Sequence, residues 1–349
     1  MLADNSDDVS NFRPTPAAMQ QFRSIHYLRG IAAVMVVVFH ICTTFPSLDP
    51  GLKNTVWLQS GVDIFFIISG FVMVESTKSK RKDSASFLFD RAIRIIPIYW
   101  IVTLCYAVFY SQAHVGMILP SLFFIPVHHP ETGALISAVI PPGWTLNLEV
   151  FFYVVFAVLI KLSYKIKLLG ILLIFTGIMA ANSISSSKSF AFYANPIIIE
   201  FWLGMLLARY YHLGRWWMLP VGVSLLFLSK TTFGISFPMF APGAFLVVAG
   251  TLSIEKNIRG SSALRLLGDS SYVLYLVHVL MIAVAHAVFG GLLQQAPLFF
   301  IFATALLSIA TALLVNRFIE KPMIKSLKNW ASARSGDSGQ RPSVHPAIP

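Results

Sequence analysis

The chain has little charge and little cysteine. Only 12% of its 349 residues are Asp, Glu, Lys or Arg, whereas about a quarter of a soluble protein of this length is charged. So few polar side chains cannot cover a water-soluble body of this mass, which excludes a soluble enzyme. The two cysteines, Cys42 and Cys105, both lie in apolar stretches. Neither a disulfide framework nor a metal site is therefore predicted.

The sequence also has no Walker-type or dinucleotide-binding glycine pattern and no repeat with a period of about 20–50 residues. The missing Walker pattern argues against an ATP-driven pump. The N-terminus carries several aspartates and no basic start, which does not fit a cleavable signal peptide. We predict a disordered cytoplasmic lead over 1–22, a transmembrane unit over 23–330 and a disordered cytoplasmic tail over 331–349.

Long apolar runs are abundant. The chain is 56% hydrophobic with a mean hydropathy of +0.72, and its longest runs approach the roughly 20 residues that cross a bilayer. We therefore predict an all-α membrane protein, a polytopic bundle of about ten transmembrane helices. The predicted spans are 30–48, 56–75, 93–111, 144–162, 166–184, 194–212, 215–230, 237–254, 270–289 and 296–318. The shorter apolar stretch 115–127 is predicted to be interfacial or re-entrant.

The basic residues are unevenly distributed between the connections. The chain has 26 Lys and Arg against 15 Asp and Glu, a net charge of +11. In a ten-span arrangement with the N-terminus inside, 23 of the 26 basic residues fall on the cytoplasmic side and 3 outside. By the positive-inside rule, this asymmetry predicts cytoplasmic N- and C-termini. Topology thus accounts for the basic excess, and no nucleic-acid partner is predicted.

Ionisable side chains at membrane depth are costly and usually face a bundle interior, so each is a candidate functional residue. Arg29 and His40 lie in the first span, on nearly one helix face and about 16 Å apart along the axis. Tyr275 and His278 lie three residues apart in the ninth span. For either histidine, the competing interpretation is a hydrogen-bonded packing residue.

Two carboxylates in the spans need buried partners. For Asp63, in the second span, an arginine or histidine is the expected partner. Glu149, in the fourth span, has Tyr153 one turn further on. It either orients a histidine, acts as a base or pairs with a basic residue. Ser69 either belongs to the site or bonds only to its own helix backbone, and Glu200 is interpreted as a structural residue.

Arg91 and Arg94 share a helix face at the predicted cytosolic end of the third span. Two guanidinium groups on one face suit a phosphate or pyrophosphate, because arginine binds such oxygens bidentately. The alternative is a topology signal that also binds lipid headgroups. After the last span, Glu320 is interpreted as part of a charged membrane exit at which Pro322 stops the helix.

Six short motifs follow one another along the chain. They are I-x-x-L-R-G with R-x10-H (Arg29 to His40), G-V-D-x-F-F-x-x-S-G-F (Gly61 to Phe71), R-x-x-R-I-x-P (Arg91 to Pro97), W-T-L-x-x-E-x-x-F-Y (Trp144 to Tyr153), G-x-x-S-Y-x-x-Y-L-x-H (Gly268 to His278) and I-E-x-P (Ile319 to Pro322). In this order the motifs resemble those of the acyltransferase-3 family of integral-membrane O-acyltransferases, and in particular its stand-alone exopolysaccharide-modifying acetyltransferases. The resemblance covers most of the chain, from about Ser24 to Pro322.

The resemblance implies a membrane-bound O-acyltransferase in the bacterial cytoplasmic (inner) membrane. Its donor would be cytosolic acyl-CoA, with acetyl-CoA favoured, used as a substrate and not as a permanently bound cofactor. Its acceptor would be a hydroxyl of an envelope glycan or of a lipid-linked sugar.

The resemblance also implies roles for individual residues. His40 would be the essential histidine, acting as a base or as an acyl carrier, with Arg29 as its companion. On chemical grounds, separately from the resemblance, Asp63 or Glu149 would fix the tautomer of His40. The residues assigned to the donor are Arg91, Arg94, Ser69, Tyr275 and His278.

Two other classes of protein account for part of the pattern. A secondary transporter or exporter of a glycan or polyprenyl-linked precursor also carries histidines and carboxylates in its spans. Its expected sign, an internal inverted repeat, is not visible in the sequence. A membrane scaffold would explain the packing but not the arginine pair.

Overall fold

The computed structural model describes residues 22–50, 54–78, 83–109, 115–128, 135–136, 138–184, 188–232 and 240–334. Most of these residues are helical. The helices are α1 (Arg23–Thr44), α2 (Gly61–Lys78), α3 (Ser84–Phe109), α4 (Val115–Leu122), α5 (Gly143–Val158), α6 (Tyr164–Asn182), α7 (Lys188–Tyr193), α8 (Ile199–Tyr210), α9 (Met218–Thr232), α10 (Ala241–Ser253), α11 (Ser262–Phe289), α12 (Pro297–Val315) and α13 (Lys321–Arg334). Within the described ranges the strands are β1 (Val127–His128) and β2 (Leu135–Ile136), which pair antiparallel.

The helices include seven stretches that are long and apolar enough to cross a membrane. These are Arg23–Thr44, Val56–Lys78, Ser84–Phe109, Tyr164–Asn182, Phe190–Leu213, Ser262–Leu292 and Pro297–Ala333. The all-α membrane bundle is therefore confirmed, and the chain is a multi-pass membrane protein. Each of the ten predicted spans overlaps an apolar helix, but α5, α9 and α10 have fewer than 18 residues. The count of ten spans stays a prediction.

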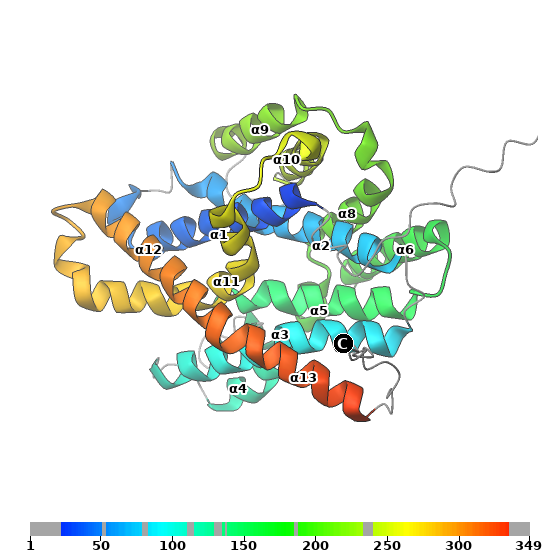
Figure 1. The fold of residues 1–349 in the computed structure, drawn as a ribbon, viewed down its shortest axis with the longest axis horizontal. Helices are drawn as coiled ribbons and strands as arrows, with labels where there is room; N and C mark the ends of the chain where they lie inside the picture. Colours follow the sequence, from blue (N-terminus) through cyan, green and yellow to red (C-terminus); the bar gives the residue numbers. More distant parts are fainter. Residues whose placement is uncertain are drawn as a thin grey trace, which may run out of the picture.

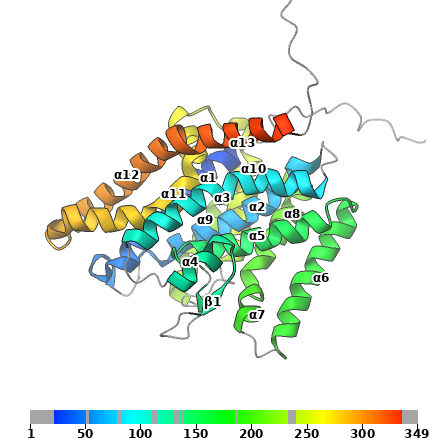
Figure 2. The ribbon, with the colours of Figure 1, turned by 90° about the horizontal axis from the view of Figure 1, so that it is seen from below.

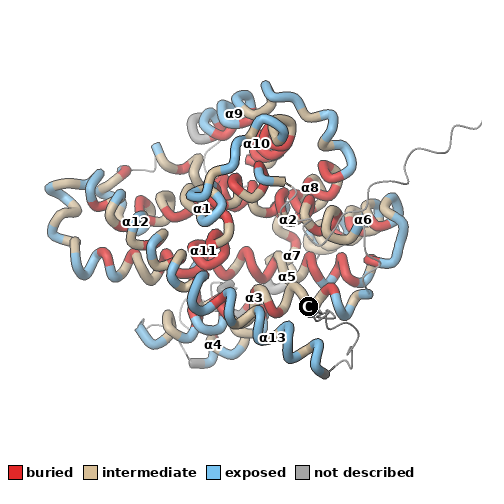
Figure 3. Tube along the Cα trace, viewed as in Figure 1, coloured by how far each residue is buried: buried red, intermediate tan, exposed pale blue. Residues whose placement is uncertain are grey.

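Helices that are distant in the sequence pack side by side (Figure 1). α1 contacts both α2 and α11, α2 packs against α8, and α11 packs against α12. Figure 2 shows α6 and α7 projecting from one side of the bundle. In Figure 3, buried residues concentrate along α2, α5 and α11, whereas α9 and α13 are largely exposed. The centre of the bundle therefore comes from α1, α2 and α11, which carry three of the six motifs.

Glycines bring α2 and α8 into backbone contact. A Cβ atom at Gly70 would lie 1.9 Å from the carbonyl oxygen of Phe201, and one at Gly204 would lie 1.9 Å from that of Ile67. Such reciprocal small-residue contacts are a common way for membrane helices to associate. This contact fixes the helix that carries Ser69 and Asp63 against α8.

The expected helix stop at Pro322 is wrong. α12 continues through a π-helical turn, Asn316–Glu320, directly into α13, and the two helices form one long rod across the bundle (Figure 1). Proline lacks the N–H that an α-helix interior needs, and a π-helical turn changes the hydrogen-bond pairing just before it. The helix therefore passes the proline instead of ending.

The structure describes little of the two predicted terminal segments. Within the predicted lead, 1–22, only Phe22 lies in the described residues. Within the predicted tail, 331–349, the described residues 331–334 continue α13. The rest of both segments lies outside the described residues.

Candidate active site

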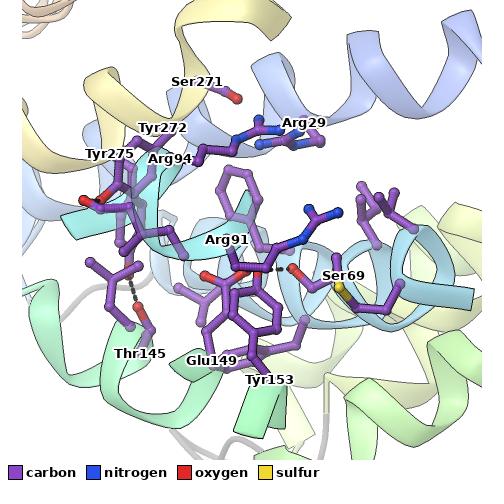
Figure 4. Close-up of a pocket in the computed structure, with 18 residues that line it drawn as sticks. Arg29, Ser69, Arg91, Arg94, Thr145, Glu149, Tyr153, Ser271, Tyr272 and Tyr275 are labelled. Carbon is purple, nitrogen blue, oxygen red and sulfur yellow. Dashed lines mark hydrogen bonds between the residues drawn. The ribbon is translucent and has the colours of Figure 1, made fainter. Parts of the chain in front are cut away.

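The structure gathers six of the nine predicted site residues around one cavity, which lies between α1, α2, α3, α5 and α11 (Figure 4). The cavity has a volume of about 80 Å³ that is accessible to the centre of a water molecule. We call it the arginine cavity; the predicted residues that line it are Arg29, Ser69, Arg91, Arg94, Glu149 and Tyr275. His40, Asp63 and His278 do not belong to its lining.

Glu149 accepts two hydroxyl hydrogen bonds in the arginine cavity. Ser69 Oγ donates to Glu149 Oε1 over 2.9 Å, and the hydroxyl of Tyr153 donates to the same oxygen. Ser69 therefore bonds to a neighbouring helix and not only to its own backbone. Glu149, in turn, contacts hydroxyl groups where a histidine was one expected partner.

Three guanidinium groups, from Arg29, Arg91 and Arg94, face a single lining carboxylate, Glu149. In Figure 4 the side chains of Arg29 and Arg94 converge, while Arg91 extends above Ser69. Arg91 Nη2 lies 3.5 Å from a serine hydroxyl on α2, and its buried Nε has no hydrogen-bond partner among the described residues. A buried surplus of forked N–H donors is complementary to an anion with several oxygens.

Glu320 adds a negative charge just outside the cavity. Its side chain is buried, accepts a hydrogen bond from Asn316 Nδ2 and attracts both Arg29 and Arg94. Glu320 was interpreted from the sequence only as part of a charged membrane exit. The sequence does not show that the helix continues through the π-helical turn, so this contribution was missed. The I-E-x-P motif was the available signal.

His40 and His278 form a pair between α1 and α11. His278 Nε2 lies 3.2 Å from His40 Nδ1, and the two ring centroids are 4.9 Å apart. His278 Nδ1 lies 3.2 Å from the carbonyl oxygen of Leu274, and His40 Nδ1 lies 3.0 Å from that of Val36. His278 is therefore the residue that contacts the ring of His40, in the place where a carboxylate was expected.

These contacts assign the tautomers of both rings. A carbonyl oxygen only accepts, so the proton of neutral His278 lies on Nδ1, and its Nε2 is an acceptor. His40 Nδ1 then carries a proton, which it shares between Val36 O and His278 Nε2. The lone pair of His40 lies on Nε2, which receives no hydrogen bond from any residue that the structure describes. His40 is thus prepared to accept a proton or to act as a nucleophile at Nε2.

Tyr275 separates the arginine cavity from the histidine pair. Its hydroxyl pairs with Thr145 Oγ1 at 2.7 Å, and its ring packs edge-on against Phe65 at 5.7 Å between centroids. The ring of His278 lies 6.1 Å away on the same helix. Thr145 was missed by sequence reasoning, although it is the threonine of the W-T-L motif. Tyr275 therefore lies between the arginine cavity and the histidine pair, which the sequence analysis treated as a single site.

Asp63 faces Glu200 instead of an arginine or a histidine. Both side chains are buried, and the two carboxyl groups interact across the contact between α2 and α8. None of their four oxygens makes a hydrogen bond, either to the other carboxyl group or to a further residue in the described part of the chain. Two carboxylates this close cannot both be ionised in an apolar interior, so one carboxyl group holds a proton. Because Asp63 neither lines the cavity nor contacts His40, we now assign it a structural role.

This arrangement predicts different effects on stability for two substitutions at Asp63. Asp63→Asn keeps a donor for Glu200, and we expect the Tm of the purified protein to change little. Asp63→Ala leaves a buried carboxyl group without a partner, which costs about 1–3 kcal/mol and lowers Tm. Equal destabilisation by both substitutions would show that a donor at position 63 does not stabilise the Glu200 carboxyl group.

Comparison with known families adds an independent finding. The model of the acyltransferase-3 family, described as an acyltransferase domain, matches residues 22–317. This range contains the arginine cavity, the histidine pair and the π-helical turn up to Arg317. No solved structure matches the chain significantly.

Three curated proteins are similar over most of their length. The exopolysaccharide production protein ExoZ of Rhizobium meliloti (strain 1021) is 32% identical over 288 residues, which cover 76% of this chain and 89% of that protein. The acyltransferase MdmB of Streptomyces mycarofaciens is 27% identical over 329 residues, covering 80% and 84%. Nodulation protein 10 of Rhizobium leguminosarum bv. viciae is 26% identical over 304 residues, covering 73% and 81%.

Proposed function

The chain belongs to the acyltransferase-3 family, and on that premise we propose that it transfers an acyl group, with acetyl favoured, from cytosolic acyl-CoA to a carbohydrate hydroxyl. The acceptor is an envelope polysaccharide or its lipid-linked precursor. A polysaccharide acceptor is supported by the similarity to a protein of exopolysaccharide production. The proposed location is the bacterial cytoplasmic (inner) membrane with both termini in the cytosol, as the distribution of basic residues favours.

The arginine cavity is the observation that carries the choice of donor. Coenzyme A bears several phosphate charges and cannot dissolve in lipid, so its charged end needs guanidinium groups at the membrane edge. Arg29, Arg91 and Arg94 supply them around one cavity. An exporter of a neutral glycan has no comparable need for three arginines in one cavity. An exporter of a polyprenyl-linked precursor, which carries phosphate, would share this need, and the transfer assay below separates the two functions.

We assign the chemistry to Nε2 of His40. As the acceptor oxygen attacks the thioester carbonyl, His40 Nε2 takes the proton of the hydroxyl group. The new C–O bond forms, the C–S bond breaks, and the departing thiolate recovers the proton from His40. In the alternative with an acyl carrier, Nε2 attacks the thioester carbonyl, the C–S bond breaks and CoA departs as a thiolate. The acceptor oxygen then attacks the acyl-imidazolium, the N–C bond breaks, and the proton of the hydroxyl group goes to the thiolate. An acyl-histidine trapped in the absence of acceptor would select this second route.

His278 positions His40 in either route. When His40 gains a charge, its Nδ1–H continues to donate to His278 Nε2, which stabilises the imidazolium ring. A hydrogen bond to a charged group contributes about 1.5–3 kcal/mol. His278→Phe removes the acceptor, so we expect kcat to fall on the order of 10- to 100-fold with an unchanged KM for acyl-CoA.

His278→Gln is the matched variant, because its side-chain oxygen can accept the same hydrogen bond. We expect it to recover part of kcat, with Tm measured for both proteins. A rise in KM with constant kcat would instead place His278 in donor binding, as its motif position first suggested.

The function itself is tested on purified protein in nanodiscs. Wild-type protein, labelled acetyl-CoA and chemically deacetylated envelope polysaccharide should yield free CoA thiol and labelled polysaccharide in equal amounts. Flux of unmodified glycan across vesicles in the absence of CoA, with no label transferred, would establish the exporter alternative.

A further inference from the structure

A second hollow, larger than the arginine cavity, lies at the N-terminal ends of α1, α11 and α13. It receives Arg23 and His26 from α1, Arg265 and Asp269 from α11, and Lys321 from α13. We call it the basic groove. By the distribution of basic residues, these helix ends are on the cytosolic side.

The basic groove contains more basic than acidic side chains. Its carboxylate, Asp269, is already paired with Lys321 Nζ at 2.8 Å and with His26 Nε2 at 3.1 Å. Arg23 and Arg265 are exposed, and neither guanidinium forms an ion pair with any residue in the described part of the chain. The Glu255 carboxylate nearby accepts hydrogen bonds from the backbone N–H groups of Arg23 and Ser24 at 2.8 Å. The guanidinium groups of Arg23 and Arg265 therefore keep their N–H donors available to an anion.

The basic groove and the arginine cavity lie at successive turns of α1. His26 lines the groove and also a small hollow behind it, and Arg29 lines both this hollow and the arginine cavity. Three helical residues advance about 4.5 Å along the axis. His26 also lies close enough to Arg29 and Arg94 for their charges to act on it. The three hollows therefore form a line from the cytosolic surface into the bundle.

His26 is held in place by a close helix contact. A Cβ atom at Gly268 would lie 2.4 Å from the carbonyl oxygen of His26 and 2.7 Å from its ring. The ring nitrogen Nε2 also lies 3.0 Å from the carbonyl oxygen of Arg265. Gly268 is the first residue of the G-x-x-S-Y motif. A glycine is needed there because only glycine lets α11 approach α1 at His26, which lines both the basic groove and the small hollow behind it.

We propose that the basic groove binds the 3′-phosphate at the nucleotide end of acyl-CoA, while the pyrophosphate and the pantetheine arm pass His26 and Arg29 into the arginine cavity. The proposal deepens the proposed function and rests on acyl-CoA as the donor. Free guanidinium groups at the surface match phosphate oxygens, and successive hollows that share His26 and Arg29 place the two ends of an elongated ligand in the groove and in the cavity. An anionic lipid headgroup has the same chemistry, so the test separates the two sources.

The test compares two donors on the Arg23→Glu/Arg265→Glu double variant in nanodiscs. Acetyl-CoA carries the nucleotide, whereas acetyl-pantetheine lacks it. We expect kcat/KM for acetyl-CoA to fall about tenfold or more, with kcat/KM for acetyl-pantetheine unchanged. Lys165→Glu, at an exposed position of α6 outside the groove, is the control and should alter neither value.

Equal losses with both donors, or a loss that follows the content of anionic lipid in the nanodisc, would overturn the proposal in favour of a lipid headgroup. Unchanged values with both donors would overturn it as well. Binding of adenosine 3′,5′-bisphosphate provides a readout without catalysis and should weaken at least about tenfold in the double variant. If wild-type protein binds this nucleotide in the groove but transfers no acetyl group, the proposed function fails and the groove assignment stands.

Discussion

Replacing His40 with glutamine should lower kcat for acyl transfer by about 100- to 10,000-fold, the usual contribution of a positioned acid–base group. The substitution removes the lone pair at Nε2 and keeps an amide that can still donate toward His278. Because the side chain is only partly buried at the α1–α11 contact, the fold should survive. The measurements are label transfer to deacetylated polysaccharide, KM for acetyl-CoA and Tm of the purified protein.

His286→Gln is the control for this experiment. His286 lies on the same helix as His278, two turns further along, where its ring packs against Phe45 at 4.9 Å between centroids. We expect its replacement to leave kcat within a factor of about two, as for most substitutions away from special features. Transfer at the wild-type rate by His40→Gln would rule out both routes proposed for His40.

The second large effect is expected at Arg91. Arg91→Met removes a fork of N–H donors from the arginine cavity, so KM for acetyl-CoA should rise about 10- to 100-fold, the equivalent of one or two charge-assisted hydrogen bonds. Arg91→Lys should recover only part of this loss, because an ammonium group cannot bind two phosphate oxygens in one plane. Lys161→Met, at an exposed position outside the cavity, should leave KM unchanged.

Stability distinguishes a binding arginine from a structural one. Arg91 has a buried Nε without a partner among the described residues and lies in the field of Arg94. Its removal should therefore leave Tm of the ligand-free protein unchanged or raise it, as is common where a site is built for a ligand. Added acetyl-CoA should raise Tm of the wild-type protein more than that of Arg91→Met. A large loss of Tm in Arg91→Met would show that Arg91 supports the fold itself.

The sequence predicted the membrane bundle and the placement of Arg91 beside Arg94 because both depend on local pattern. Apolar runs locate helices, and spacing within one helix places Arg91 beside Arg94. Neither signal shows which helices are neighbours. The pairing of His40 with His278 joins residues 238 positions apart, and the partner of Asp63 depends on the glycine contact between α2 and α8. Both were therefore assigned to the wrong partners.

The π-helical turn after α12 affects the balance of charge at the arginine cavity. It adds one residue to a turn, and one residue rotates all following side chains by about 100° around the helix axis. Glu320, at the end of this turn, lies close to Arg29 and Arg94. The π-helical turn thus shifts the register of the helix and brings the carboxylate of Glu320 to the arginine cavity. There it partly balances the charges of the arginines before a donor binds. Deleting one residue from the turn should turn this carboxylate away, and the charge balance of the site would change without the loss of any residue in its lining.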